Sequence, residues 1–82
     1  MTNNHKLNLK SKSAITKLLR LLWELDALKS QATDEERLRD FDIYIRDIRR
    51  FLEKVSLRAP SLDEIQVYID DYQGVVEHMK VI

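Results

Sequence analysis

The chain has 82 residues, of which 34% are charged and 44% are hydrophobic, and its formal net charge is zero. That length holds one domain, and that balance is typical of a folded helical protein rather than a disordered one. The absence of cysteine excludes disulfides and thiolate metal sites. A single glycine and a single proline leave few positions for turns, which excludes a sheet of many strands.

Residues 1–12 are mostly polar and carry several lysines, so we expect a flexible N-terminal arm there. Residues 13–82 then form a single domain. The arm lacks the continuous apolar stretch of a secretory signal, and no apolar run in the chain approaches the ~20 residues of a transmembrane helix. The expected location is therefore cytoplasmic.

The first predicted helix covers residues 13–29. Its apolar residues recur every three or four positions, which keeps them on one side of a helix that turns every ~3.6 residues. Further apolar residues widen that side to an arc of more than ~200° at ~100° per residue. The central row is Ile15, Leu18, Leu22 and Leu25; Ala14, Leu21 and Leu28 lie on one flank, and Leu19 and Trp23 lie on the other.

So broad an apolar arc needs more cover than two neighbouring helices give. The candidate protein interface is therefore Leu19, Leu21, Trp23 and Leu28, with Trp23 as a large anchor. Two alternatives stay open: the arm, through Leu7 and Leu9, covers this helix, or the helix lies on a membrane surface. Asp26 also falls within the arc, either partly exposed or paired with a Lys or Arg of another helix.

The second predicted helix covers residues 34–57. Thr33 followed by Glu36 predicts a capping box at its start, and Pro60 ends it because the residue before a proline is forced out of helical geometry. Its apolar positions are spaced by three and four residues in alternation. They are Leu38, Phe41, Ile45, Ile48, Leu52 and Val55.

The third predicted helix covers residues 62–79, with a capping box formed by Ser61 and Glu64. Gly74 falls on its polar side, where glycine costs roughly 1 kcal/mol relative to alanine, and the sequence gives no reason for it. The apolar positions repeat the spacing of the second helix: Leu62, Ile65, Ile69, Tyr72, Val76 and Met79. Because both connections are short, we predict an all-α, antiparallel up-down-up three-helix bundle with coiled-coil-like heptad seams.

Ile43 and Val67 point away from the apolar rows of their helices. Basic residues surround Ile43, and acidic residues surround Val67. The basic set is Arg39, Arg46, Arg50 and Lys54, and the acidic set is Asp63, Asp70, Asp71 and Glu77. These are either two solvated faces or parts of an interface in which a basic face meets an acidic one.

No residue set in the sequence indicates catalysis or metal binding. His78 has Gly74 and Val75 at the preceding helical positions, so a helical metal-ligand pair is missing, and the neighbouring Glu77 opposes a role as phosphoryl acceptor. Neighbouring carboxylates such as Asp70 and Asp71 point ~100° apart on a helix and cannot share a proton unaided. We therefore expect no enzyme, no cofactor and no metal.

The expected function is a small protein–protein interaction module, such as a regulator, an inhibitor, an immunity-type protein or an assembly factor. It would act as a homodimer or bind a protein partner through the first helix. The alternative is a nucleic-acid-binding regulator, although a pI of about 6.7 and interspersed acidic residues disfavour it. Its contacts would be Lys10, Lys12, Lys17, Arg39, Arg46 and Arg50. No motif in the chain indicates a known family.

Overall fold

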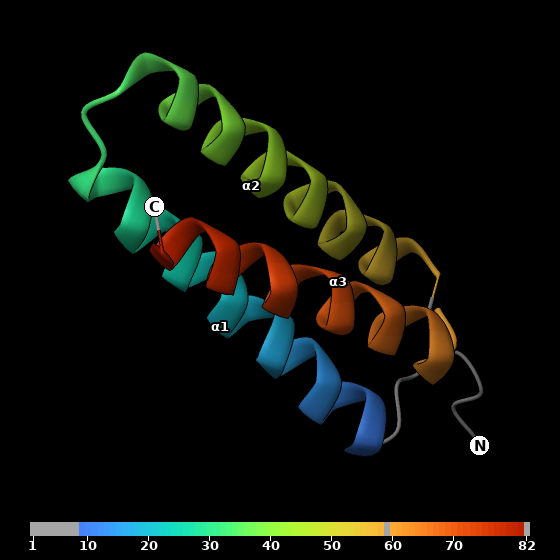
Figure 1. Cartoon of the computed structure of the whole chain (residues 1–82). Helices are drawn as coiled ribbons and strands as arrows, with labels where there is room; N and C mark the ends of the chain where they lie inside the picture. The colour runs from blue at the N-terminus through green and yellow to red at the C-terminus, as the bar shows by residue number, and fades with distance from the viewer. Residues whose placement is uncertain (1–8, 59, 82) are drawn as a thin grey trace, which may run out of the picture.

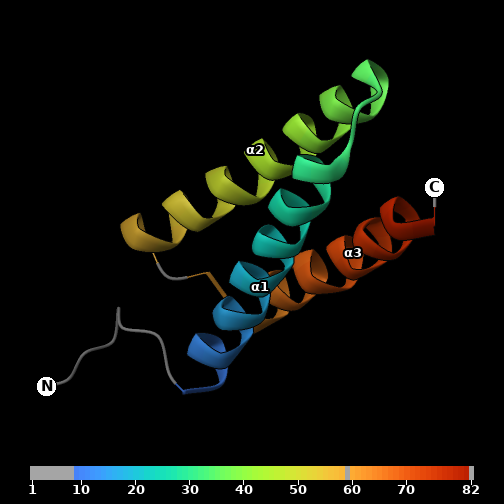
Figure 2. The same cartoon turned by 90° about the vertical axis from the view of Figure 1, so that its left-hand side faces the viewer.

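The computed structural model describes residues 9–58 and 60–81 and contains three α-helices that run up, down and up (Figure 1). Helix α1 spans Leu9–Gln31, α2 spans Glu35–Leu57 and α3 spans Leu62–Val81. Figure 2 shows α1 running between α2 and α3, closest to α2 at the Gln31 end. Because α1 packs against both other helices, the predicted three-helix bundle is confirmed.

The start of α1 differs from the prediction. Residues 9–12 were expected in a flexible arm, but they form the first turn of α1, and Ser11 is buried. Lysine is a good helix former, so Lys10 and Lys12 extend the helix in the N-terminal direction. The rest of the expected arm, residues 1–8, lies outside the described residues.

The N-cap of α2 is Asp34, one residue later than predicted. Its side chain accepts a hydrogen bond of 3.1 Å from the backbone N–H of Arg37. The predicted capping box of Thr33 and Glu36 is therefore wrong. A carboxylate in the cap position also interacts favourably with the positive end of the helix dipole, which a threonine hydroxyl does less well.

The capping box at the start of α3 is confirmed. The backbone N–H of Glu64 donates to Ser61 Oγ at 3.1 Å, and the backbone N–H of Ser61 donates to Glu64 Oε1 at 3.3 Å. Two of the backbone donors that a helix start leaves unpaired are thus satisfied by one pair of side chains. At its other end α3 continues to Val81, two residues beyond the prediction.

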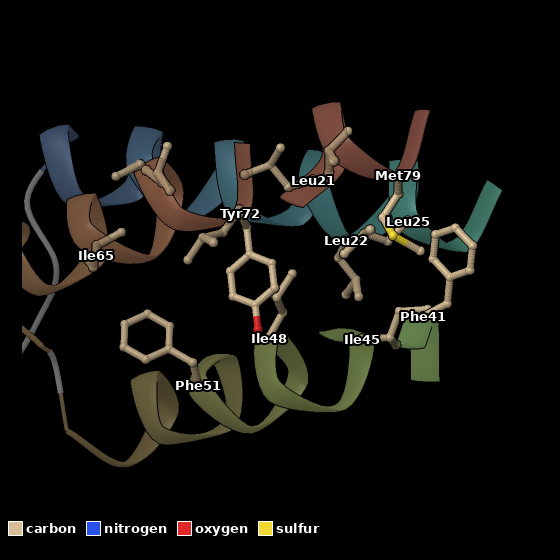
Figure 3. Close-up of a cluster of buried hydrophobic side chains, with 14 residues drawn as sticks. Leu21, Leu22, Leu25, Phe41, Ile45, Ile48, Phe51, Ile65, Tyr72 and Met79 are labelled. Atoms are coloured by element: carbon tan, nitrogen blue, oxygen red, sulfur yellow. The ribbon is translucent and has the colours of Figure 1, made fainter. Parts of the chain in front are cut away.

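Side chains from all three helices meet in one buried cluster (Figure 3). Leu18 and Leu25 of α1 have no exposed surface, because α2 covers one side of their row and α3 covers the other. At one end of the cluster Met79 of α3 lies beside Phe41 of α2. The cluster consists of Ala14, Leu18, Leu21, Leu22, Leu25, Phe41, Ile45, Ile48, Phe51, Ile65, Ile69, Tyr72, Val76 and Met79.

The backbones of α2 and α3 approach α1 closely but hardly approach each other. Large aromatic side chains, which we call the aromatic seam (Tyr44, Phe51, Tyr68 and Tyr72), fill the space between them. The rings of Phe51 and Tyr68 stack with centroids 4.0 Å apart, and Tyr44 meets Tyr72 edge to face at 6.1 Å. Contacts of both geometries are favoured by the quadrupoles of aromatic rings.

One polar contact crosses the aromatic seam. The Tyr72 hydroxyl points toward α2 and donates a hydrogen bond to Oδ2 of Asp47 (Figure 3). Burial, the hydrogen bond to Asp47 and the charge of that carboxylate all raise the pKa of Tyr72 above its ordinary value. Burial, followed by the nearby charges of Asp47, Asp71 and Glu64, also raises the pKa of Tyr68. Both hydroxyls therefore hold their protons more tightly in the folded chain.

Replacing Tyr72 with phenylalanine should lower the free energy of unfolding by about 1 kcal/mol at pH 7, because it removes the hydrogen bond to Asp47. The raised pKa gives this hydroxyl a contribution to stability that is complete below about pH 10 and declines as the pH rises through that value. The wild type should therefore lose more stability between pH 7 and pH ~10.5 than Tyr72→Phe does. Urea unfolding at both pH values measures the difference.

The matched control is Tyr44→Phe. It also removes a hydroxyl from the aromatic seam, but this hydroxyl makes no hydrogen bond with another residue of the described chain. An equal loss of stability in both variants would contradict the importance of the contact between Tyr72 and Asp47.

Gly74 lies on the exposed side of α3, within the helix and without a positive φ. A Cβ built on it would meet nothing within 4 Å. Neither backbone geometry nor packing in the single chain therefore requires a glycine there. The residue only removes helix propensity from the middle of α3.

Gly74→Ala should raise the free energy of unfolding by about 0.5–1 kcal/mol, since alanine loses less backbone entropy on folding and finds open space here. Urea unfolding at low protein concentration measures the change. A destabilised Gly74→Ala variant would contradict the open environment of this position.

Candidate functional site

The structure separates the four residues of the predicted α1 interface. Leu21 is only 7% exposed and belongs to the core, so the expectation that it forms an outward contact is wrong. Leu28 is half-buried and packs against the core, and Leu19 is also half-buried. Trp23 is 61% exposed. Of the predicted set, Trp23 alone lies largely in solvent.

Leu21 is covered because its flank of α1 faces α3. On that side Lys80 of α3 lies 3.2 Å from Glu24 of α1, and the hydrogen bond and charge of Glu24 raise the pKa of Lys80. Lys80 and Glu24 are both partly exposed, so their contact orients the two helices more than it stabilises them. Helix α3 therefore covers the flank of α1 that carries Leu21.

Trp23 lies on the flank of α1 that is turned away from α3. Leu19 precedes it by one helical turn, and the exposed Ala27 follows it by one turn. We call these three residues the Trp23 surface. The surface thus consists of one exposed aromatic ring, a half-buried leucine and an exposed alanine.

Two ion pairs join α1 to α2 beside this surface. Asp26 lies 3.9 Å from Arg49, and Lys29 contacts Asp42 at 2.5 Å. The expectation that Asp26 pairs with a basic residue of another helix is confirmed. All four side chains are partly exposed, so each pair contributes little energy and mainly fixes the alignment of the two helices.

Arg37 joins the start of α2 to the end of α3, a contact that the sequence did not reveal. Its Nη2 atom donates a hydrogen bond of 2.9 Å to the backbone carbonyl of Met79, and its guanidinium lies 5.8 Å from the ring centre of Phe41. Its Nη1 atom has no acceptor among the described residues. A cation is well placed beside the carbonyls that end a helix, so Arg37 stabilises the C-terminal end of α3.

The basic residues proposed for nucleic-acid binding are exposed but lie apart. Lys10 and Lys17 of α1 line a surface hollow next to α3. Arg46 and Arg50 line two hollows on α2 and share both with acidic side chains, Asp42 in one and Asp47 in the other. Lys12 and Arg39 are exposed as well. No continuous basic patch follows from this placement.

Within residues 9–58 and 60–81, no group of His, Asp or Glu side chains is arranged to hold a metal ion. A surface hollow with a volume of about 430 Å³ lies on α2 beside Tyr72. None of the helices in this part of the chain is both long and apolar enough to cross a membrane.

Sequence reasoning missed the aromatic seam. The available signal was positional: Tyr44 and Phe51 are seven residues apart, and Tyr68 and Tyr72 are four apart, so each pair shares one flank of its helix. It also passed over Leu57, which is 84% exposed at the end of α2.

Comparison of the chain with protein-family models, with curated proteins and with solved structures finds no match.

Proposed function

We propose that this chain is a protein-interaction module that binds a protein, either a second copy or a different chain, through the Trp23 surface of α1. The exposed indole of Trp23 carries the proposal. Tryptophan combines a large apolar area with one N–H donor and is enriched among the residues that dominate binding energy at interfaces.

The position of α1 supports this function. Its inward side is fixed by Leu18 and Leu25, which are completely buried, and its flanks are tied to α2 and α3 by ion pairs. The backbone that carries Trp23 is therefore held in place before a partner arrives, so less backbone entropy is lost on binding. Because Leu21 is buried, the contact depends on Trp23 more heavily than the sequence predicts.

The second candidate function is nucleic-acid binding. It is supported by Arg39, Arg46 and Arg50, which are exposed and take part in none of the ion pairs among the described residues. It is weakened by the separation of these arginines from Lys10 and Lys17 and by the acidic residues between them. Protein binding is therefore the better supported function.

Trp23→Ala should weaken partner binding by about 30-fold or more, the usual effect of truncating a dominant interface tryptophan. The wild type and the variant are used as baits in the native cell, and bound proteins are compared by quantitative mass spectrometry. Leu57→Ala is the matched control, because it shortens another exposed apolar side chain that lies on α2. Proteins retained by Leu57→Ala and lost by Trp23→Ala are the expected partners, and identical capture by both variants would reject the proposal.

Trp23 is the only tryptophan, so its fluorescence reports directly on the Trp23 surface. If a second copy covers it, the emission maximum shifts to shorter wavelength as the chain concentration rises. An unchanged maximum, together with a shift on adding a captured protein, assigns the surface to a different chain.

For the nucleic-acid alternative, we expect fluorescence anisotropy to detect no binding of a labelled oligonucleotide at low salt. Binding that weakens steeply between about 50 and 200 mM salt, and that is reduced by Arg46→Gln, would favour nucleic acid instead.

A further inference from the structure

We propose that the outer side of α2 and α3 binds a second copy of this chain, forming a dimer whose two-fold axis runs parallel to the helices. This α2–α3 face lies on the opposite side of the aromatic seam from α1 and is defined by Ile43, Arg50, Lys54, Glu64, Val67 and Asp71. The inference does not rest on the function proposed for the Trp23 surface, because that surface belongs to α1.

The α2–α3 face exposes two large aliphatic side chains. Ile43 on α2 is 56% exposed and Val67 on α3 is 57% exposed. A hollow of about 430 Å³ lies between Ile43 and the rings of Tyr44 and Tyr72. Arg46, Asp47 and Arg50 also line this hollow, so the exposed apolar groups form separate spots among charged side chains rather than one continuous apolar centre.

The charges of the α2–α3 face are divided between its two helices. Arg50 and Lys54 are basic residues of α2, and neither takes part in an ion pair with another described residue. Glu64 and Asp71 are acidic residues of α3, and both lie close enough to Tyr68 to raise its pKa. The α2 half of the face is thus basic on balance, although Asp47 of α2 also lines its hollow, and the α3 half is acidic.

This division selects the symmetry of the dimer. When two copies meet face to face about an axis parallel to the helices, α2 of one copy lies against α3 of the other. Both contacts then join a basic helix to an acidic one. An axis perpendicular to the helices within the same plane would set α2 against α2 and bring like charges together. Lys54 and Glu64 line one hollow within the single chain, so the match with a second copy depends mainly on Arg50 and Asp71.

Contacts within one chain fix which residues lie at the same height along the bundle. Asp47 contacts Tyr72, and Phe51, four residues later on α2, contacts Tyr68, four residues earlier on α3. Because the two helices are antiparallel, each step of one residue forward along α2 corresponds to a step of one residue back along α3. By this count Arg50 is level with Ile69.

Rotation about an axis parallel to the helices leaves these heights unchanged. Arg50 of one copy then lies within two residues, or about 3 Å along the axis, of Asp71 of the second copy. Lys54 lies within one residue of the height of Glu64 of the second copy. Arg50 and Lys54 of α2 thus lie near the heights of Asp71 and Glu64 of the second copy. Asp47, which is level with Tyr72, lies within one residue of the height of Asp71 and opposes this match.

The exposed aliphatic residues do not meet each other. Val67 of one copy is level with Leu52 of the second copy, but Leu52 packs on the core and Phe51 is buried, so on the outer side Val67 lies between the heights of Arg50 and Lys54. Ile43 is level with Val76 of the second copy and faces the stretch of α3 that contains Gly74. A Cβ on Gly74 would have no neighbour within 4 Å in the single chain, so this stretch is open to an isoleucine side chain. The dimer thereby gives Gly74 a position next to a partner helix.

The size of the face sets the expected affinity. Helices of 23 and 20 residues are about 30 Å long, and two such helices side by side are about 20 Å wide. Such a face covers roughly 600 Å² on each copy, at the lower end of the range for specific interfaces. The dimer should therefore form in the micromolar range.

Sedimentation velocity of the full chain from about 1 to 500 µM tests the proposal. We expect a reversible dimer, and a monomer throughout this range would overturn the inference. Arg50→Glu and Asp71→Arg should each raise the dissociation constant at least about tenfold, because every substitution acts at both symmetric contacts. Far-UV circular dichroism verifies that each variant remains helical.

Combining Arg50→Glu with Asp71→Arg in one chain should restore the dimer, since the two charges exchange places across the interface. The matched control combines Asp71→Arg with Arg20→Glu on α1. It has the same zero net charge but leaves Arg50 facing a new arginine, so it should remain monomeric. Recovery in the control, or none in the exchanged variant, would overturn the proposed contact.

The fluorescence of Trp23 separates this inference from the function proposed above. Dimerisation through the α2–α3 face should leave the emission maximum of Trp23 unchanged. A dimer that shifts this maximum uses the Trp23 surface, and this result would overturn the α2–α3 dimer while supporting the proposed function. If the chain dimerises through the α2–α3 face and Trp23→Ala captures the same partners as the wild type, the α2–α3 dimer is supported. The function proposed for the Trp23 surface is then rejected.

Discussion

The structure depends on covering one helix from two sides. Most apolar side chains of α1 span a broad arc, and burial of apolar surface is the main favourable term in folding, so α1 is stable only between two other helices. Leu18 and Leu25 reach complete burial in this position. A chain of this size has a small core and a thin margin of stability, so this arrangement leaves little freedom for any other.

The central position of α1 determines how α2 and α3 meet. Since both pack closely on α1, their backbones stay apart, and only long side chains can join them. Phe51, Tyr68 and Tyr72 fill this space, and the hydroxyl of Tyr72 reaches Asp47 near the edge of the core. The aromatic seam leaves the outer side of α2 and α3 uncovered, with polar charges around a few exposed aliphatic side chains. The α2–α3 face is thus a consequence of how the core is built.

The sequence predicted the fold because the spacing of apolar residues depends only on the geometry of the helix. It predicted the Ser61–Glu64 capping box for the same local reason. The sequence wrongly predicted Thr33 as the N-cap of α2, because the neighbouring Asp34 takes that position. The spacing of polar residues does not show which of two adjacent capping residues will be used. The prediction also failed for residues 9–12, because polar lysine-rich segments are compatible with both arm and helix.

The candidate site was predicted only in part, for a reason that concerns packing. A helical projection places Leu21 and Trp23 on opposite flanks of one arc, but it does not show how far a neighbouring helix reaches around each flank. In the structure α3 covers Leu21, whereas the flank carrying Trp23 stays open. The aromatic seam was not predicted because it depends on the distance between α2 and α3. This distance cannot be derived from the pattern of residues within one helix.

The two proposed surfaces lie on different sides of the bundle, and this has a consequence for binding. In a dimer formed through the α2–α3 face, α1 of each copy is on the outside, so two Trp23 surfaces point away from the two-fold axis. A partner with two matching sites could then bind both copies at once, and the second contact would form at the high effective concentration set by the first. A surface as small as that around Trp23 would gain substantial affinity from such bivalent binding. In such a dimer, self-association through one face would compensate for the limited area of the other.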